Sequence, residues 1–147
     1  MYTIIIANYN RTSELKRCLD SIELAFSGVI EPEVIVIEDG SEKILEDNRI
    51  TKHIFLSENG GPVRARLEGA KNANFEYILL LDSDDTILTS AVKTIEKIKS
   101  INPNYELYGF TYKGGESLVD FKVKSIKDYC EFVSYEGRTS DYIMLIK

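Results

Sequence analysis

The sequence predicts an α/β protein, an αβα sandwich in which helices cover both faces of a central, mostly parallel sheet. Short continuous runs of Ile, Val and Leu are typical of strands that are buried on both faces. They alternate with segments whose apolar residues recur every three or four positions, as they do on helices. The chain has 147 residues and an ordinary globular composition, so we expect one compact domain.

The first three elements form a predicted βαβ unit. We expect strands at residues 3–7 and 34–37, the second closed by a turn at residues 38–41. Between them, Thr12 or Ser13 is expected to cap a helix. Its apolar face consists of Leu15, Cys18, Leu19, Ile22 and Phe26. A right-handed crossover then brings the two strands together in the sheet.

The next segment repeats this alternation. A third strand is predicted at residues 53–56, and Pro62 is suited to the first turn of the helix that follows the loop. The apolar face of that helix is predicted at Val63, Leu67 and Ala70. The run at residues 77–81 gives the strongest strand prediction in the sequence.

The last third of the chain has a different pattern. A helix opened by Thr89 or Ser90 is predicted through residues 91–98. Beyond residue 104 we predict antiparallel strands at residues 107–112 and 117–124 around Gly114 and Gly115, with a third at 142–146. The apolar ending at residues 145–147 suggests that the natural protein continues.

Charge and composition exclude several classes of function. The net charge of −6 argues against a nucleic-acid partner, and an anionic substrate would need a metal bridge. His53 is the only histidine, which excludes metal sites built on two histidines. Cys18 and Cys130 fit neither a disulfide framework nor a zinc site. Without a signal peptide or a transmembrane segment, we expect a cytoplasmic location, with peripheral membrane contact left open.

Polar clusters follow three of the predicted strands. They lie at residues 8–11, 38–39 and 82–85. Because ligands of open α/β sheets bind at the carboxyl ends of the strands, the three clusters should converge on one crevice.

The cluster at residues 82–85 carries the clearest chemical signal. Asp82, Asp84 and Asp85 would repel one another at close range, and a hard cation such as Mg²⁺ or Mn²⁺ would relieve that repulsion. An isolated cluster of this kind is more often a solvated turn with a helix cap. The preceding apolar run and the other strand ends favour the metal site.

Other polar residues allow two interpretations each. Asp39 either makes a turn before Gly40 or accepts a hydrogen bond from a nucleobase. Arg64 and Arg66 could meet a diphosphate at the start of their helix, although a solvated position is as good an interpretation for Arg64. Tyr9 could equally pack in the core.

Taken in order, these motifs resemble the nucleotide-binding portion of family 2 glycosyltransferases, which have the Rossmann-like GT-A fold. The matching segments are residues 3–11, 34–41, 59–69 and 77–85. Together they cover about the first two-thirds of the chain, and the ordered set is more specific than any one motif. Three residues depart from the usual pattern: Ala7 replaces a proline, Glu38 an aspartate and Leu67 an asparagine.

The resemblance implies a donor site for a nucleotide-diphosphate sugar, with UDP favoured, and Mg²⁺ or Mn²⁺ as cofactor. It implies that Asp39 contacts the base, Asp82 the ribose or diphosphate, and Asp84 the metal, while Ala7 and Tyr9 line the nucleoside pocket. The full expected set for substrate binding is Ala7, Asn8, Tyr9, Arg11, Glu38, Asp39, Arg66, Asp82 and Ser83, with Asp84 and Asp82 for the metal.

The resemblance further implies inverting transfer of the sugar to the hydroxyl of a saccharide or lipid-linked acceptor, as in polysaccharide synthesis. Within one domain, residues 1–104 would bind the nucleotide sugar, and residues 105–147 would begin an acceptor side that is truncated here. The catalytic base is not assigned. Asp120, Asp128 and Asp141 are nominal candidates, and none is favoured.

Two rival interpretations stay open at this stage. Residues 79–87 also resemble the first motif of haloacid-dehalogenase-type phosphatases, in which Asp82 would be the nucleophile and Asp84 the acid/base. Alternatively, the chain is a non-catalytic module that binds a nucleotide sugar.

Overall fold

The computed structural model describes residues 1–29, 31–101, 107–113, 116–123 and 143–146. The strands are β1 (Tyr2–Asn8), β2 (Glu33–Asp39), β3 (Lys52–Leu56), β4 (Tyr77–Asp82), β5 (Leu107–Lys113), β6 (Glu116–Val123) and β7 (Ile143–Ile146). The helices are α1 (Thr12–Phe26), α2 (Pro62–Lys71) and α3 (Ala91–Ile101). Within these residues the strands form one sheet in the order β3-β2-β1-β4-β7-β5-β6.

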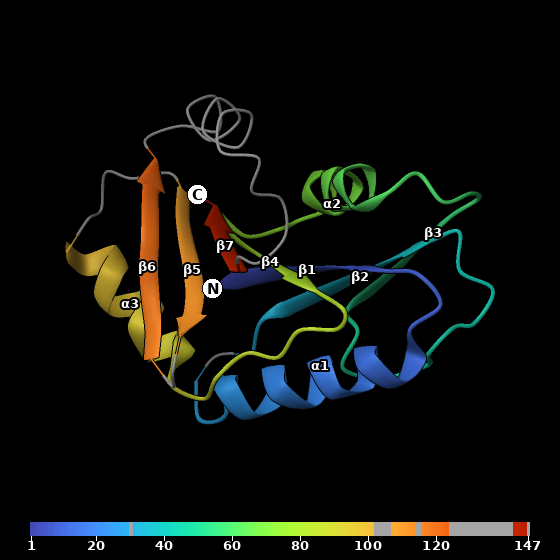
Figure 1. Cartoon of the computed structure of the whole chain (residues 1–147). Coiled ribbons are helices and arrows are strands. Elements are labelled where there is room, and N and C mark those ends of the chain that lie inside the picture. The colour runs from blue at the N-terminus through green and yellow to red at the C-terminus, as the bar shows by residue number, and fades with distance from the viewer. Residues whose placement is uncertain (30, 102–106, 114–115, 124–142, 147) are drawn as a thin grey trace.

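The parallel half of the sheet consists of β3, β2, β1 and β4, as predicted. Helices α1 and α2 lie on opposite faces of it (Figure 1). Ile4 and Ile6 pack on the side of α1, whereas Ile5 packs on the side of α2. Alternate residues of a strand point to opposite faces of the sheet. Because helices cover both faces, every residue of these strands faces apolar packing, which explains the unbroken apolar runs. The predicted α/β sandwich is confirmed.

Helix α1 buries the predicted face, but its expected cap is wrong. Neither Thr12 nor Ser13 caps the helix, because Arg11 occupies the N-cap position and no side-chain hydrogen bond is made there. The Ser13 hydroxyl instead donates to Glu14, at 2.8 Å. The chain turns through Asn10, whose φ of 56° lets the helix begin one residue earlier than a Thr12 cap would require.

Helix α2 packs through different residues from those predicted. Val63 and Leu67 are 77% and 58% exposed, so the prediction that they form the apolar face is wrong. Of the predicted residues, Ala70 alone packs against the sheet, next to the buried Ala65 and Gly69. Small residues therefore form the contact face of this helix.

The reason is the close approach of α2 to the sheet at Gly69. A Cβ atom at this position would lie 2.5 Å from Ile5 Cγ2 and 2.8 Å from Ile37 Cδ1. A hydrophobic pattern finds large side chains, and it does not detect a helix that packs through glycine and alanine.

Strand β2 is longer than predicted. Glu38 and Asp39 belong to the strand rather than to a turn, because Glu38 pairs with Asn8 of β1 and Asp39 with Leu56 of β3. The turn begins at Gly40, whose φ of 75° favours glycine. Both acidic residues therefore sit on a rigid element at its carboxyl end.

The antiparallel half of the sheet follows the predicted change of pattern. Strand β7 lies between β4 and β5 and is antiparallel to both, and β6 pairs with β5. Gly114 and Gly115, predicted to form the turn, lie outside the described residues.

Candidate functional site

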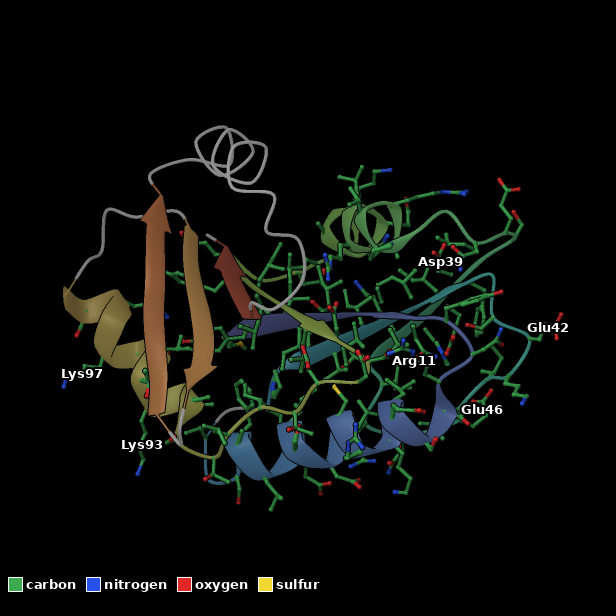
Figure 2. All side chains as sticks on the ribbon, viewed as in Figure 1. Arg11, Asp39, Glu42, Glu46, Lys93 and Lys97 are labelled. Atoms are coloured by element: carbon green, nitrogen blue, oxygen red, sulfur yellow. The ribbon has the colours of Figure 1, made fainter. Side chains whose placement is uncertain are left out.

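A pocket of about 320 Å³ opens at the carboxyl ends of three parallel strands. Strand β1 and its loop contribute Ala7, Asn8, Tyr9 and Arg11, and β2 contributes Asp39. The α2 region contributes Asn59, Gly61, Pro62 and Arg66, while β4 and the loop after it contribute Asp82, Ser83 and Asp84. Figure 2 shows Arg11 and Asp39 near one end of the molecule, far from Lys93 and Lys97 of α3. The predicted convergence of the three polar clusters is confirmed.

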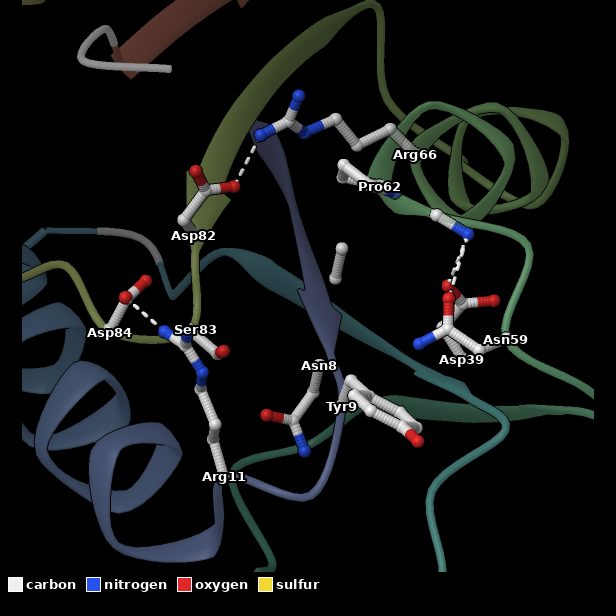
Figure 3. A pocket seen from close by; sticks show the side chains of 12 residues that line it. Asn8, Tyr9, Arg11, Asp39, Asn59, Pro62, Arg66, Asp82, Ser83 and Asp84 are labelled. Atoms are coloured by element: carbon white, nitrogen blue, oxygen red, sulfur yellow. Dashed lines mark hydrogen bonds and ion pairs between the residues drawn. The ribbon is translucent and has the colours of Figure 1, made fainter.

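Asp84 lies at the mouth of this pocket and is paired with an arginine. The Arg11 guanidinium forms an ion pair with its carboxylate, across the gap between the start of α1 and the end of β4 (Figure 3). The two side chains are 48% and 49% exposed. Solvent therefore reaches this pair, and such pairs stabilise a fold only weakly.

Asp82 has an arginine partner of its own. Arg66 reaches across from α2 and forms an ion pair with its carboxylate (Figure 3). The Arg66 Nε is buried and has no hydrogen-bond partner in the described part of the chain. A buried donor without a partner is costly, and it marks a place where a ligand or a water would be accommodated.

Asp39 organises the glycine loop ahead of α2. Its two carboxylate oxygens accept hydrogen bonds from the backbone N–H groups of Gly60, at 2.9 Å, and Gly61, at 2.7 Å. Gly40 is needed beside it, because a Cβ there would lie 2.5 Å from the backbone nitrogen of Asn59. Each carboxylate oxygen has a second lone pair, so Asp39 retains the capacity to accept a further hydrogen bond in the pocket.

Glu38 does not line the pocket. It is almost completely buried, and its carboxylate accepts a hydrogen bond from Asn8 Nδ2, at 2.8 Å, and lies 3.1 Å from His53 Nε2. The Asn8 Oδ1 has no partner among the described residues. Glu38 therefore holds the side chain of a pocket residue in place.

The loop that carries the acidic cluster is fastened to α1 through its backbone. Arg17 donates to the carbonyl oxygen of Asp84 at 3.0 Å, and the Ser21 hydroxyl accepts from the backbone N–H of Ile87 at 3.0 Å. The Cys18 thiol lies 3.8 Å from the carbonyl oxygen of Asp82. Burial raises the pKa of this thiol to about 12, so it stays protonated. Sequence reasoning treated α1 as packing alone and missed these contacts.

The donor set fits a hard divalent cation only in part. Asp82 and Asp84 offer carboxylate oxygens on one pocket wall, the chemistry that Mg²⁺ and Mn²⁺ prefer. In the described ranges, however, no group of three His, Cys, Asp or Glu side chains is placed to hold a metal ion. The residues therefore fit a cation that takes one or two ligands from the protein and the others from a bound phosphate and water.

Comparison with protein families decides between the glycosyltransferase and the phosphatase interpretations. The family model for glycosyl transferase family 2 matches residues 3–143. The chain belongs to this family. None of the matches supports the phosphatase alternative.

Curated relatives agree with this assignment. The chain is 29% identical over 122 residues to the uncharacterized glycosyltransferase YwdF of Bacillus subtilis, covering 77% of this chain and 45% of that protein. It is 33% identical over 93 residues to the poly-beta-1,6-N-acetyl-D-glucosamine synthase of Staphylococcus epidermidis, covering 58% of this chain and 22% of the synthase. The chain thus spans less than half the length of these relatives.

Solved structures confirm the GT-A fold. TarS of S. aureus (1–349) matches with a TM-score of 0.65 and 26% identity, covering 80% of this chain and 37% of TarS. The same protein in complex with UDP-GlcNAc matches with a TM-score of 0.60 and 27% identity, covering 72% of this chain and 32% of TarS. The mannosyltransferase PcManGT of Pyrobaculum calidifontis, in complex with GDP-Man and Mn²⁺, shares the fold at 17% identity, a TM-score of 0.60 and coverage of 72% and 34%.

Two further predictions concern membrane-spanning helices and the catalytic base. No helix in the described part of the chain is long and apolar enough to cross a membrane. Of the nominal base candidates, Asp120 lies in β6, and Asp128 and Asp141 lie outside the described residues. The catalytic base is therefore not assigned.

Proposed function

We propose that this chain forms the donor site of an inverting, metal-dependent glycosyltransferase that takes its sugar from a nucleoside diphosphate. The observation that carries the proposal is the pairing of Asp82 and Asp84 with two arginines on one pocket at the carboxyl edge of the sheet. Carboxylates suit a divalent cation, and guanidinium groups suit a diphosphate. A site for a metal-bound nucleoside diphosphate needs both.

Uridine diphosphate is the donor nucleotide that we favour. TarS, at 27% identity, has been solved with UDP and with UDP-GlcNAc. In this chain, Tyr9 is half exposed at the pocket, where its ring could stack on a base, and Asp39 could accept from a base N–H. Ala7, Asn8 and Ser83 would complete the substrate wall, with Glu38 holding Asn8 from behind.

The proposed division of work follows from the same positions. Residues 1–104 would bind the donor, and residues 105–147 would begin the side of the protein that binds a saccharide or lipid-linked acceptor. A base on that side would take the proton from the acceptor hydroxyl as it displaces the diphosphate at the anomeric carbon. When bound at Asp84 and Asp82, Mg²⁺ or Mn²⁺ would neutralise charge on the leaving diphosphate.

We also propose a cytoplasmic location, in keeping with the buried free thiol of Cys18.

Calorimetry with UDP tests the proposal. We expect UDP to bind at least about tenfold more tightly with Mn²⁺ than with EDTA, since the cation offsets the charge of the carboxylates. GDP at the same Mn²⁺ concentration tests the preference for uridine. No binding of either nucleotide, or binding that is the same in EDTA, would rule out the metal-dependent donor site.

A further inference from the structure

The Asp84 carboxylate, which we propose as the metal ligand, has one of its two oxygens occupied in this structure. The Arg11 guanidinium is paired with it, and both side chains are about half exposed. A cation that binds this oxygen of Asp84 therefore competes with Arg11 for it. Because exposed ion pairs of this kind contribute little, moving Arg11 costs little.

We propose that Arg11 is an exchangeable counter-ion of Asp84. It neutralises the carboxylate until a divalent cation binds there, and it then donates to the diphosphate of the donor. This inference rests on the proposed function and extends it, because it gives Arg11 two successive partners and makes metal and donor binding depend on one side chain.

The charges of the pocket support such an exchange. Its lining carries Arg11 and Arg66 against Asp39, Asp82 and Asp84, a net charge of −1. A divalent cation and a diphosphate with about two negative charges leave this net charge unchanged. The cation takes over the carboxylates, and the phosphate oxygens take over the guanidinium groups. The two arginines, Asp82 and Asp84 then each keep a partner of opposite sign. Asp39 keeps its hydrogen bonds from the backbone of Gly60 and Gly61.

The anchoring of the two chain segments allows Arg11 to move while Asp84 stays. The backbone of Arg11 is fixed at the start of α1, where its carbonyl oxygen accepts from the Leu15 N–H at 3.0 Å. Its long side chain is free to turn towards the pocket that it already lines (Figure 3). Meanwhile Arg17 holds the carbonyl oxygen of Asp84. The metal ligand therefore keeps its place when its counter-ion leaves.

The substitution Arg11→Gln tests this exchange, because it should shift two binding parameters in opposite directions. UDP is titrated at a series of Mn²⁺ concentrations, and the Kd of UDP is followed to saturation with Mn²⁺. We expect the Mn²⁺ concentration for half-maximal effect to fall by about two- to fivefold, since no guanidinium competes for Asp84. The Kd of UDP at saturating Mn²⁺ should rise about tenfold, since a charged hydrogen bond to phosphate is lost. Arg11→Lys, which keeps the charge, should reduce both shifts.

Arg64→Gln is the matched control. Arg64 is also 48% exposed and paired with a carboxylate, that of Glu58, but it does not line the pocket. Both parameters should stay within about twofold of the wild type in this variant. In Arg11→Gln, unchanged parameters, or both weakened together as for local damage, would overturn the exchange alone. Wild-type protein without Mn²⁺-dependent binding of UDP would instead overturn the proposed function.

Discussion

The carboxylates at the two ends of the parallel sheet differ in their partners. At the amino end, Glu33 is buried and accepts hydrogen bonds from the Thr3 hydroxyl, at 2.7 Å, and from Asn74 N, at 2.9 Å. The Lys52 ammonium lies 3.3 Å away. At the carboxyl end, Asp82 and Asp84 are each paired with one arginine beside an open pocket. The first carboxylate is saturated, and the other two are available for exchange.

The pKa of Glu33 illustrates the difference. Burial alone would raise it, but hydrogen bonds from Thr3 and Asn74 together with Lys52 outweigh burial, and the pKa lies below its usual range. Because these partners belong to three different segments, the charge of Glu33 serves the fold. We infer that Glu33, with several fixed donors, is structural, whereas Asp82 and Asp84, each with one long cationic partner beside the pocket, are suited to bind a ligand.

Among the variants that test this difference between the two ends, Asp84→Asn should have the largest effect on ligand binding. Residues that only orient a metal ligand already change metal affinity by about 10- to 100-fold, so loss of the ligand itself should weaken Mn²⁺-dependent UDP binding by about 100-fold or more. The free energy of unfolding should change by less than about 0.5 kcal/mol, since the side chain is half exposed. Calorimetry and urea unfolding measure the two quantities, and a large loss of stability would contradict the account.

Glu33→Ala should show the reverse pattern. It leaves the Thr3 hydroxyl and the Asn74 amide without their acceptor, and among the described residues Lys52 keeps only the carbonyl oxygen of Asn72, so we expect a loss of about 3 kcal/mol in unfolding free energy. The folded fraction should still bind UDP with Mn²⁺ as the wild type does. Urea unfolding provides the first measurement, and weakened UDP affinity in folded protein would break the distinction between the two ends.

Gly69→Ala tests the contact that positions α2, and with it Arg66. The added methyl group would collide with Ile5 and Ile37, and overpacking of this kind costs about 1–3 kcal/mol. Leu67→Ala, on the exposed face of the same helix, is the control and should change stability by less than about 0.5 kcal/mol. If thermal unfolding ranks the two variants the other way, the assignment of the buried face of α2 is wrong.

The smallest expected effect on stability is that of Asp47, which belongs to neither of the two carboxylate groups compared above. Its hydrogen bond from Arg49 lowers its pKa to about 2, below the ordinary value of 3.8. A lowered pKa in the folded state stabilises the fold above pH 4, and that contribution is lost as the pH falls from 4 to 2. Linkage gives about 2 kcal/mol at most. Urea unfolding at pH 6 and pH 3 should show a loss that is smaller in Asp47→Asn, while carboxylates such as Glu33, whose pKa is also lowered, account for the remainder.

The sequence predicted the parallel sheet and its ligand edge well, because both depend on patterns that lie within one segment. Continuous apolar runs identify strands that are covered on both faces, and the polar residues that end them must meet at one edge. The pocket accordingly contains all of the predicted site residues except Glu38, and it adds Asn59, Gly61 and Pro62. The motif at residues 59–62 could have signalled these three.

What the sequence did not predict are interactions between distant segments. The pairing of Arg11 with Asp84 spans 73 positions, and the contact of Arg17 with the Asp84 carbonyl spans 67. The contact face of α2 was missed for a related reason, since glycine and alanine gain their importance only when the opposite surface is known. Local periodicity carries no information about such partners.

The central claim is that the metal and the donor bind at the carboxyl end of the sheet. Nuclear magnetic resonance with substoichiometric Mn²⁺ and excess UDP tests it directly, because the paramagnetic ion broadens only nearby amide signals. We predict broadening of Ser83, Asp84 and Gly61, which line the pocket. Thr3 and Asn74 should be broadened far less, since the effect falls steeply with distance and a strand of five residues places them roughly 16 Å away. Broadening that is uniform, or centred on Thr3 and Asn74, would contradict the account.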